Sequence, residues 1–129
     1  MVVDSSALVA ILLFENDAEL LADTIRLSHR PRLSAANLAE TLIVLNRRNG
    51  TDNRPDVQEF VVGSGMIVEP VDLAQAWRAG DAYGRFGKGR HRAALNYGDC
   101  FAYALAKSLD LPLLFKGDDF RHTEIRPAL

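Results

Sequence analysis

Short apolar segments alternate with helical patterns along this chain, and acidic residues stand beside four of them. Alternation of strands and helices is typical of an α/β fold, in which right-handed crossovers make a mostly parallel sheet with helices on both faces. The carboxyl ends of parallel strands share one edge of such a sheet, where a ligand can reach them. We therefore expect one edge to gather these acids, which are Asp4, Glu40, Asp99 and the adjacent Asp118 and Asp119.

The spacing of apolar residues predicts where the individual elements lie. Strand-like runs cover residues 1–3, 32–35, 66–71 and 111–115. Helical patterns cover residues 7–14, 17–27, 36–48, 56–62, 73–83 and 97–109. Gly50 is placed to end the third helix, and Asp72 and Asn96 are placed to begin the last two. Spacing alone does not give the order of the strands.

The size of the chain predicts one α/β domain spanning residues 1–129. Its single cysteine, Cys100, cannot form an internal disulfide, which favours a reducing, cytoplasmic location. The apolar run at residues 7–14 is too short to span a bilayer, so no membrane partner is expected.

The acidic positions predict a divalent metal site. Carboxylate oxygens suit Mg²⁺ or Mn²⁺, and several of them cannot stay ionised side by side without a cation. We predict Asp4 and Asp99 as direct ligands, with Glu40 and the last acidic pair binding directly or through water. Ser6 is placed to hydrogen-bond an acid and hold it in position. A metal held in this way can activate water and stabilise charge on a phosphodiester.

Each acid also has an ordinary structural explanation. Asp4 and Asp99 suit helix N-termini, and Glu40 follows Asn37 at the spacing of a capping-box partner. Asp118 and Asp119 suit a turn. Taken singly, these explanations are at least as good as a metal site, and it is the joint placement of the acids that favours function.

Four long blocks of sequence resemble the PIN-domain ribonucleases, in particular the VapC-type toxins of type II toxin-antitoxin systems. The blocks are MVVDSSALVAIL, SAANLAE, GKGRHRAALNYGDCFAYALAK and LPLLFKGDDFRHTEI, in the family's order. Asp4, Glu40, Asp99 and one of Asp118 or Asp119 fall on the family's acidic positions, with Asp119 slightly favoured, and Ser6 falls on its usual serine or threonine.

The resemblance implies an activity and partners. It implies a Mg²⁺- or Mn²⁺-dependent endoribonuclease that cuts a structured RNA, commonly a transfer or ribosomal RNA, and so inhibits translation. It further implies neutralisation by a VapB-type antitoxin and pairing as a homodimer. The resemblance does not identify the RNA, the cleavage site, the number of metals or the antitoxin.

A glycine-rich basic segment lies shortly before Asp99. Its cationic residues suit contact with an RNA backbone, although a solvated loop is an equally good explanation. These RNA-binding candidates are Arg85, Lys88, Arg90 and Arg92. Apolar stripes on the helices at 17–27 and 36–48 could form the antitoxin groove.

Aromatic residues also recur along the last two predicted helices. They could stack on bases, but their helical spacing favours core packing or a subunit surface. They are Trp77, Tyr83, Phe86, Tyr97, Phe101 and Tyr103.

Other functions remain to be weighed against the nuclease. Receiver domains need an aspartate at the end of the central strand, where this chain has Glu69 and Pro70, and dehalogenase-type phosphatases need a second acid two residues after Asp4. The alternative that the chain is a catalytically inactive regulatory subunit, acting through antitoxin and operator DNA binding, is compatible with the sequence. The net charge of −2 disfavours direct DNA binding by this chain, so the antitoxin would have to supply it.

Overall fold

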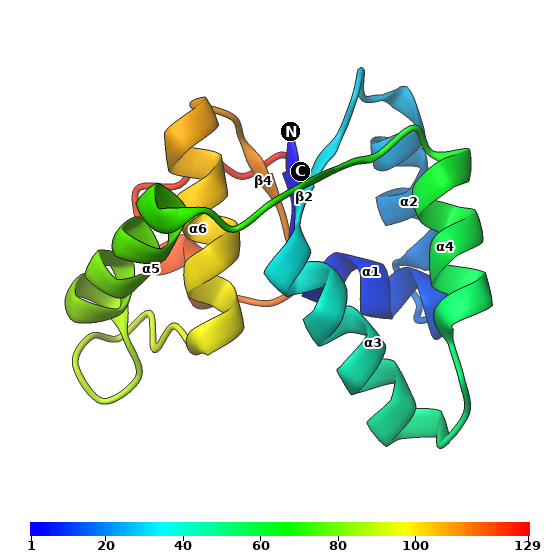
Figure 1. Ribbon diagram of the computed structural model, residues 1–129, viewed down its shortest axis with the longest axis horizontal. Helices are drawn as coiled ribbons and strands as arrows, with labels where there is room; N and C mark the ends of the chain where they lie inside the picture. The colour runs from blue at the N-terminus through cyan, green and yellow to red at the C-terminus, as the bar shows by residue number, and fades with distance from the viewer.

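The computed structural model describes residues 1–129 and has a four-stranded, fully parallel sheet at its centre (Figure 1). Its strand order is β3-β2-β1-β4. The strands are β1 (Val2–Val3), β2 (Arg32–Ser34), β3 (Ile67–Glu69) and β4 (Leu113–Leu114). Each lies within one of the four predicted runs. The prediction of a parallel sheet flanked by helices is therefore confirmed.

Six α-helices and one 3₁₀ helix connect and cover the strands. They are α1 (Ser5–Leu12), α2 (Ala18–Leu27), α3 (Ala35–Asn49), α4 (Arg54–Gly63), α5 (Leu73–Phe86), α6 (Tyr97–Leu109) and η1 (Asp119–His122). α3 ends as predicted at Gly50, whose left-handed φ of 67° suits a residue without a side chain. α4 begins earlier than predicted because Pro55 is tolerated in the first turn of a helix. None of these helices is long and apolar enough to cross a membrane.

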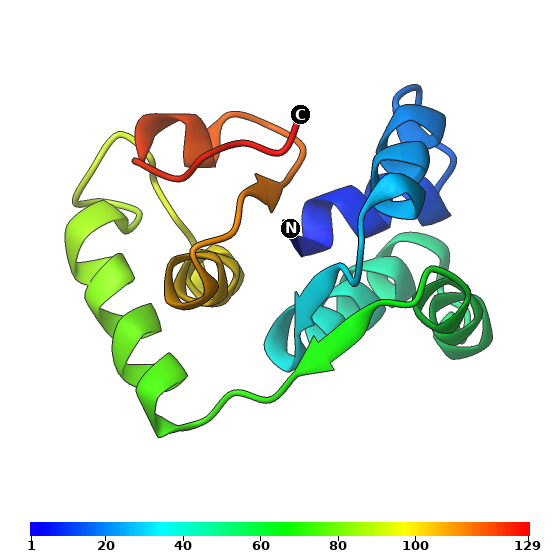
Figure 2. The same cartoon turned by 90° about the horizontal axis from the view of Figure 1, so that it is seen from above.

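Alternate residues of the short strands enter two different cores. Val2 and Leu113 pack with residues of α5 and α6, whereas Val3 and Leu114 pack with residues of α1 and α2. This division follows from the alternation of side chains along a strand. Figures 1 and 2 show the result, with α5 and α6 on one side of the sheet and α1, α2 and α4 on the other. Burial on both faces explains why β1 and β4 are wholly apolar, whereas the less buried β2 and β3 also carry Arg32, Ser34 and Glu69.

The connections place polar residues at a single edge of the sheet. β1 runs directly into Asp4 and α1, and β2 runs into α3, while the chain leaving β4 turns toward η1. Since β1 pairs in parallel with both β2 and β4, the carboxyl ends of these three strands lie together. The edge where they meet carries the candidate site.

Candidate functional site

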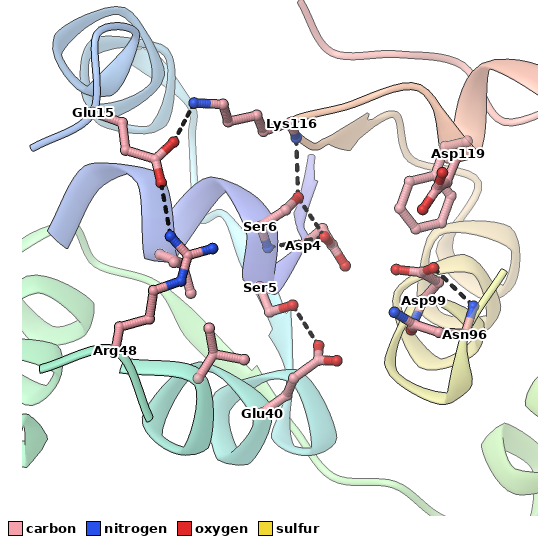
Figure 3. Close-up of a pocket in the computed structure, with 13 residues that line it drawn as sticks. Asp4, Ser5, Ser6, Glu15, Glu40, Arg48, Asn96, Asp99, Lys116 and Asp119 are labelled. Atoms are coloured by element: carbon pink, nitrogen blue, oxygen red, sulfur yellow. Dashed lines mark hydrogen bonds and ion pairs between the residues drawn. The ribbon is translucent and has the colours of Figure 1, made fainter. Parts of the chain in front are cut away.

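A cavity of about 370 Å³ opens at the carboxyl edge of the sheet. Four of the predicted acids line it, each from a different segment of the chain: Asp4 before α1, Glu40 in α3, Asp99 in α6 and Asp119 after β4 (Figure 3). Residues up to 115 positions apart in the sequence therefore face one space. Ser6 lines the same cavity.

Asp4 is both the N-cap of α1 and an acid of the cavity. Its Oδ2 accepts hydrogen bonds from the backbone nitrogen of Ser6 at 2.9 Å and from Ser6 Oγ at 2.5 Å. Its Oδ1 is buried and has no hydrogen-bond partner. Burial raises the pKa of Asp4 to about 6, and the charge of Glu40 adds to the rise against the opposing effect of the Ser6 hydrogen bonds. One carboxylate oxygen is thus anchored and the other is available to a ligand.

Asp99 also combines a helix-capping role with a place in the cavity. Its Oδ2 accepts from the backbone nitrogen of Asn96 at 2.9 Å, and its own backbone nitrogen donates to Asn96 Oδ1 at 2.9 Å. This reciprocal pair is a capping box that fixes the first turn of α6. Burial raises the pKa of Asp99 to about 7, and the negative charges of Asp4, Asp119 and Glu40 raise it further. The acids are therefore close enough to influence one another's charge.

Glu40 is held by one donor from α1 and one from its own helix. Its Oε1 accepts from Ser5 Oγ and from Asn37 Nδ2, the latter at 3.2 Å. The buried Asn37 also donates to the carbonyl oxygen of Gly98 at 3.0 Å and so ties α3 to α6. The capping-box explanation of Glu40 is wrong, because Ser34 is the N-cap of α3 and Asn37 lies inside the helix. Glu40 instead faces the cavity.

The structure separates the last two acids. Asp119 lines the cavity, whereas Asp118 does not; the side chain of Asp118 is 85% exposed and pairs with Arg121. The predicted basic residues also lie outside the cavity lining. Arg85 pairs with Glu124, and Lys88 lines a neighbouring groove. Arg90 and Arg92 make no hydrogen bond or ion pair through their side chains.

Two cations that the basic segment does not supply stand at the rim of the cavity. Lys116 Nζ contacts Glu15 and, at 2.9 Å, Asp17, while Arg48 lies 3.8 Å from Glu15. The backbone nitrogen of Lys116 donates to Ser6 Oγ at 3.0 Å, which links β4 to the cap of α1. Lys116 lies just after β4, where a side chain can reach the edge of the sheet, but nothing in the local sequence indicates Glu15 or Arg48. They reach the site only because the ends of α1 and α3 converge.

Comparison with known proteins shows the family. Residues 1–125 match the PIN domain. Ribonuclease VapC of Mycolicibacterium smegmatis is 48% identical over 125 residues that cover 97% of each chain. The chain belongs to the VapC-type PIN-domain ribonucleases. Ribonuclease VapC30 of Mycobacterium tuberculosis is also similar, at 45% identity over 97% of this chain and 95% of its own.

The VapC fold extends to a more distant relative of known structure. The crystal structure of VapC20 of M. tuberculosis, described as a toxin that cleaves the sarcin-ricin loop, superposes with a TM-score of 0.73. It covers 98% of both chains at 19% sequence identity. The arrangement of strands and helices is therefore shared where most of the sequence has changed.

The residues of this VapC cavity fit a divalent cation that keeps part of its water shell. No three acidic, histidine or cysteine side chains are close enough to hold an ion by themselves. Mg²⁺ is commonly bound by one or two carboxylates, with water completing its coordination. Asp4 Oδ1, buried without a partner, is the kind of atom that such an ion satisfies. Asp4 and Asp99 are the residues that would hold it.

The raised pKa of Asp99 predicts a pH-dependent stability of the metal-free VapC chain. From about pH 4 to pH 7 the folded state keeps a proton that the unfolded state has lost, so this group's contribution falls as pH rises. Asp99→Asn removes the effect. We expect the variant to gain at least about 1 kcal/mol, or roughly 4 °C in Tm, over wild type between pH 5 and pH 8 in EDTA.

Thermal unfolding at the two pH values measures this difference. Mg²⁺ should reduce it at pH 8, because a cation that binds only the folded wild type stabilises that protein selectively. Asp118→Asn, at an exposed acid outside the cavity, is the matched control. An equal Tm difference at both pH values would show that Asp99 ionises as freely in the folded protein as in the unfolded chain.

Proposed function

We propose that this VapC protein is a Mg²⁺- or Mn²⁺-dependent endoribonuclease that hydrolyses phosphodiester bonds in a structured RNA, a transfer or ribosomal RNA, and so inhibits translation in the cytoplasm. The observation that carries the proposal is the meeting of Asp4, Glu40, Asp99 and Asp119 in one cavity at the edge of the sheet. Caps and turns account for these residues one at a time. They do not account for four carboxylates from separate segments facing one space.

We assign each acid a role from its contacts. Asp4 and Asp99 hold the cation, which when bound lowers the pKa of water and offsets negative charge on the phosphate. Ser6 fixes Asp4 through Oδ2 and keeps Oδ1 directed to the ligand. Glu40, held at Oε1 by Ser5 and Asn37, is positioned to accept a proton. We place Asp119 rather than Asp118 in the catalytic set, because Asp119 lines the cavity.

The rim of the cavity supports an RNA substrate. Arg48 and Lys116 are the only cationic side chains in its lining, and both suit contact with backbone phosphates on either side of the scissile bond. We keep Arg85, Lys88, Arg90 and Arg92 as contacts for more distant parts of the RNA. Arg48→Ala should then weaken RNA binding more than Arg92→Ala. Gel-shift titrations of RNA with each variant in the Asp99→Asn background, which leaves the RNA uncut, measure the difference.

We further propose a VapB-type antitoxin as the partner that neutralises the toxin and a homodimer as its assembled form. A cleft of about 580 Å³ between the end of α1, α2 and α4 is lined by apolar residues, which include Phe60 and the 90% exposed Phe14, and by the charged Arg26, Asp56 and Glu59. Of the two helices predicted for the antitoxin groove, α2 contributes to this cleft and α3 does not. An amphipathic antitoxin helix fits such a surface. Light scattering measures the molar mass and so tests the dimer. Co-expression with the protein encoded beside the toxin tests the antitoxin, and growth arrest that this protein does not relieve would contradict the proposal.

Brief expression in a host without the antitoxin tests the nuclease itself. We expect new RNA 5′ ends at one or a few positions of a structured RNA. The purified protein should reproduce these cuts with Mg²⁺ or Mn²⁺ and lose at least about 100-fold in rate in EDTA, because the carboxylates alone do not activate water. Growth arrest without new ends would favour the regulatory subunit, and undiminished cutting in EDTA would exclude the metal mechanism.

A further inference from the structure

A second cavity, of about 750 Å³, lies between α5 and α6. The two helices pack against each other at a steep angle on one side of the sheet, so that Figure 2 shows α6 end-on and α5 lengthwise. Its lining is mostly apolar and includes the rings of Tyr83, Tyr97 and Phe101. Its volume is in the range of sites for small organic ligands. We call it the α5–α6 groove.

The α5–α6 groove continues from the carboxylate cavity. Asn96 lines both spaces, and it is the residue that caps α6 and holds Asp99. Tyr97 follows directly, is 78% exposed, and meets the ring of Phe101 edge to face at 4.8 Å between centroids. The two spaces therefore adjoin at Asn96, the residue that is hydrogen-bonded to Asp99.

The aromatic residues of this region divide into two groups. Phe86 and Tyr103 are buried in the core, as the helical spacing predicts. Trp77, Tyr83 and Tyr97 are exposed. Of the rings that line the groove, Phe101 packs in part against the core, whereas core packing does not explain Tyr83 and Tyr97.

We propose that the α5–α6 groove binds an unpaired base of the RNA, adjacent to the phosphodiester that is cleaved at the carboxylates. The inference rests on the proposed nuclease function and adds a subsite to it. A flat aromatic base matches the ring-lined walls, since bases stack on tyrosine and phenylalanine irrespective of their identity.

The polar groups of the groove match the rest of a nucleotide. Lys88 is the only charged residue in its lining and is positive, which complements a phosphate. The Tyr83 hydroxyl donates to the Lys88 carbonyl oxygen at 3.4 Å and so connects the wall of the groove to the start of the basic segment. Lys88, one of the four predicted RNA-binding residues, therefore lies in the lining of the proposed base site. Continuity with the acids favours RNA over a protein segment as the occupant.

Two glycines of α5 supply a matched test. A side chain built at Gly80, in the groove lining, or at Gly84, one turn later and outside the lining, meets nothing within 4 Å. Leucine is a better helix former than glycine, so neither Gly80→Leu nor Gly84→Leu should unfold α5. Only Gly80→Leu fills the groove. We expect it to lower kcat/KM on a hairpin RNA about tenfold or more, the effect of losing one stacked base, with Gly84→Leu within twofold of wild type.

A binding measurement separates this inference from the proposed function. Hairpin RNAs carrying 2-aminopurine at each loop position are titrated into Asp99→Asn, which leaves them uncut. At one loop position the fluorescence of 2-aminopurine should be quenched on binding. Adding Tyr97→Ala or Gly80→Leu to the Asp99→Asn protein should abolish this quenching. Wild-type cleavage with no effect of either change, at unchanged Tm, would overturn the base site alone. If Gly80→Leu lost the dimer mass or antitoxin binding but kept its cleavage, the groove would be a protein-binding site. A wild-type protein that cuts no RNA would refute the proposed nuclease function.

Discussion

Asp99→Asn is expected to reduce RNA cleavage by roughly 10²- to 10⁴-fold while the protein stays folded. The change removes one negative charge from a cavity in which Asp99 lies within electrostatic reach of Asp4, Glu40 and Asp119. A neutral amide is a poor ligand for Mg²⁺ compared with a carboxylate. The loss should therefore appear as weaker metal binding and as slower cleavage at saturating metal.

The local structure makes this substitution a clean one. The Oδ1 of an asparagine at this position can still accept the hydrogen bond from the backbone nitrogen of Asn96, so the capping box of α6 is kept. Circular dichroism should report an unchanged helix content. The measurements are single-turnover cleavage rates and a metal titration by calorimetry. Asp118→Asn should cleave at the wild-type rate, since Asp118 is exposed and pairs with Arg121, and wild-type cleavage by Asp99→Asn would remove Asp99 from the mechanism.

The sheet and the acids at its edge could be predicted from sequence because each depends on local patterns. Short apolar runs followed by Asp4 or by a helix indicate strand ends, and parallel strands bring their carboxyl ends together. Asp99 was found differently, from its place in the first turn of the helix that Asn96 caps. A capping role and a place in the cavity also proved compatible, since Asp4 and Asp99 each use one oxygen in a helix cap and still line the cavity.

The support of these acids depends on contacts between distant segments, which spacing does not reveal. Ser5 meets Glu40 across 35 positions, and Asn37 meets Gly98 across 61. The spacing of Asn37 and Glu40 even suggested a helix cap that does not exist, because the chain places Ser34 at the start of α3. The RNA contacts predicted from the sequence likewise lie only in the basic segment and do not include Arg48. Arg48 reaches the rim of the cavity because the end of α3 lies beside Glu15. Local charge density is a poor guide to which cation faces a site.

Gly98→Ala should lower both the stability and the activity of the protein. A Cβ at position 98 would overlap the carboxylate of Glu40, so that the Glu40 side chain and α6 could not both keep their positions. Either Glu40 leaves its hydrogen bonds to Ser5 and Asn37, or α6 moves and carries Asp99 with it. We expect a loss of about 1–3 kcal/mol in stability from the overlap and a fall in cleavage of at least about 100-fold. Gly84→Ala, in the open part of α5, should lose neither.

A double-mutant cycle identifies the overlap with Glu40 as the cause. Glu40→Ala removes the side chain that the new methyl group would strike, so Gly98→Ala should cost almost no stability in that background, a clear departure from additivity. Activity should behave differently, because the Glu40 carboxylate is absent from the double variant, and cleavage should stay as low as in Glu40→Ala alone. Thermal unfolding and cleavage rates of the four proteins give both cycles. Additive losses of stability would mean that Gly98 is needed for the backbone of α6 rather than for the space that Glu40 occupies, and wild-type cleavage by Gly98→Ala would show that the position of Glu40 does not limit the reaction.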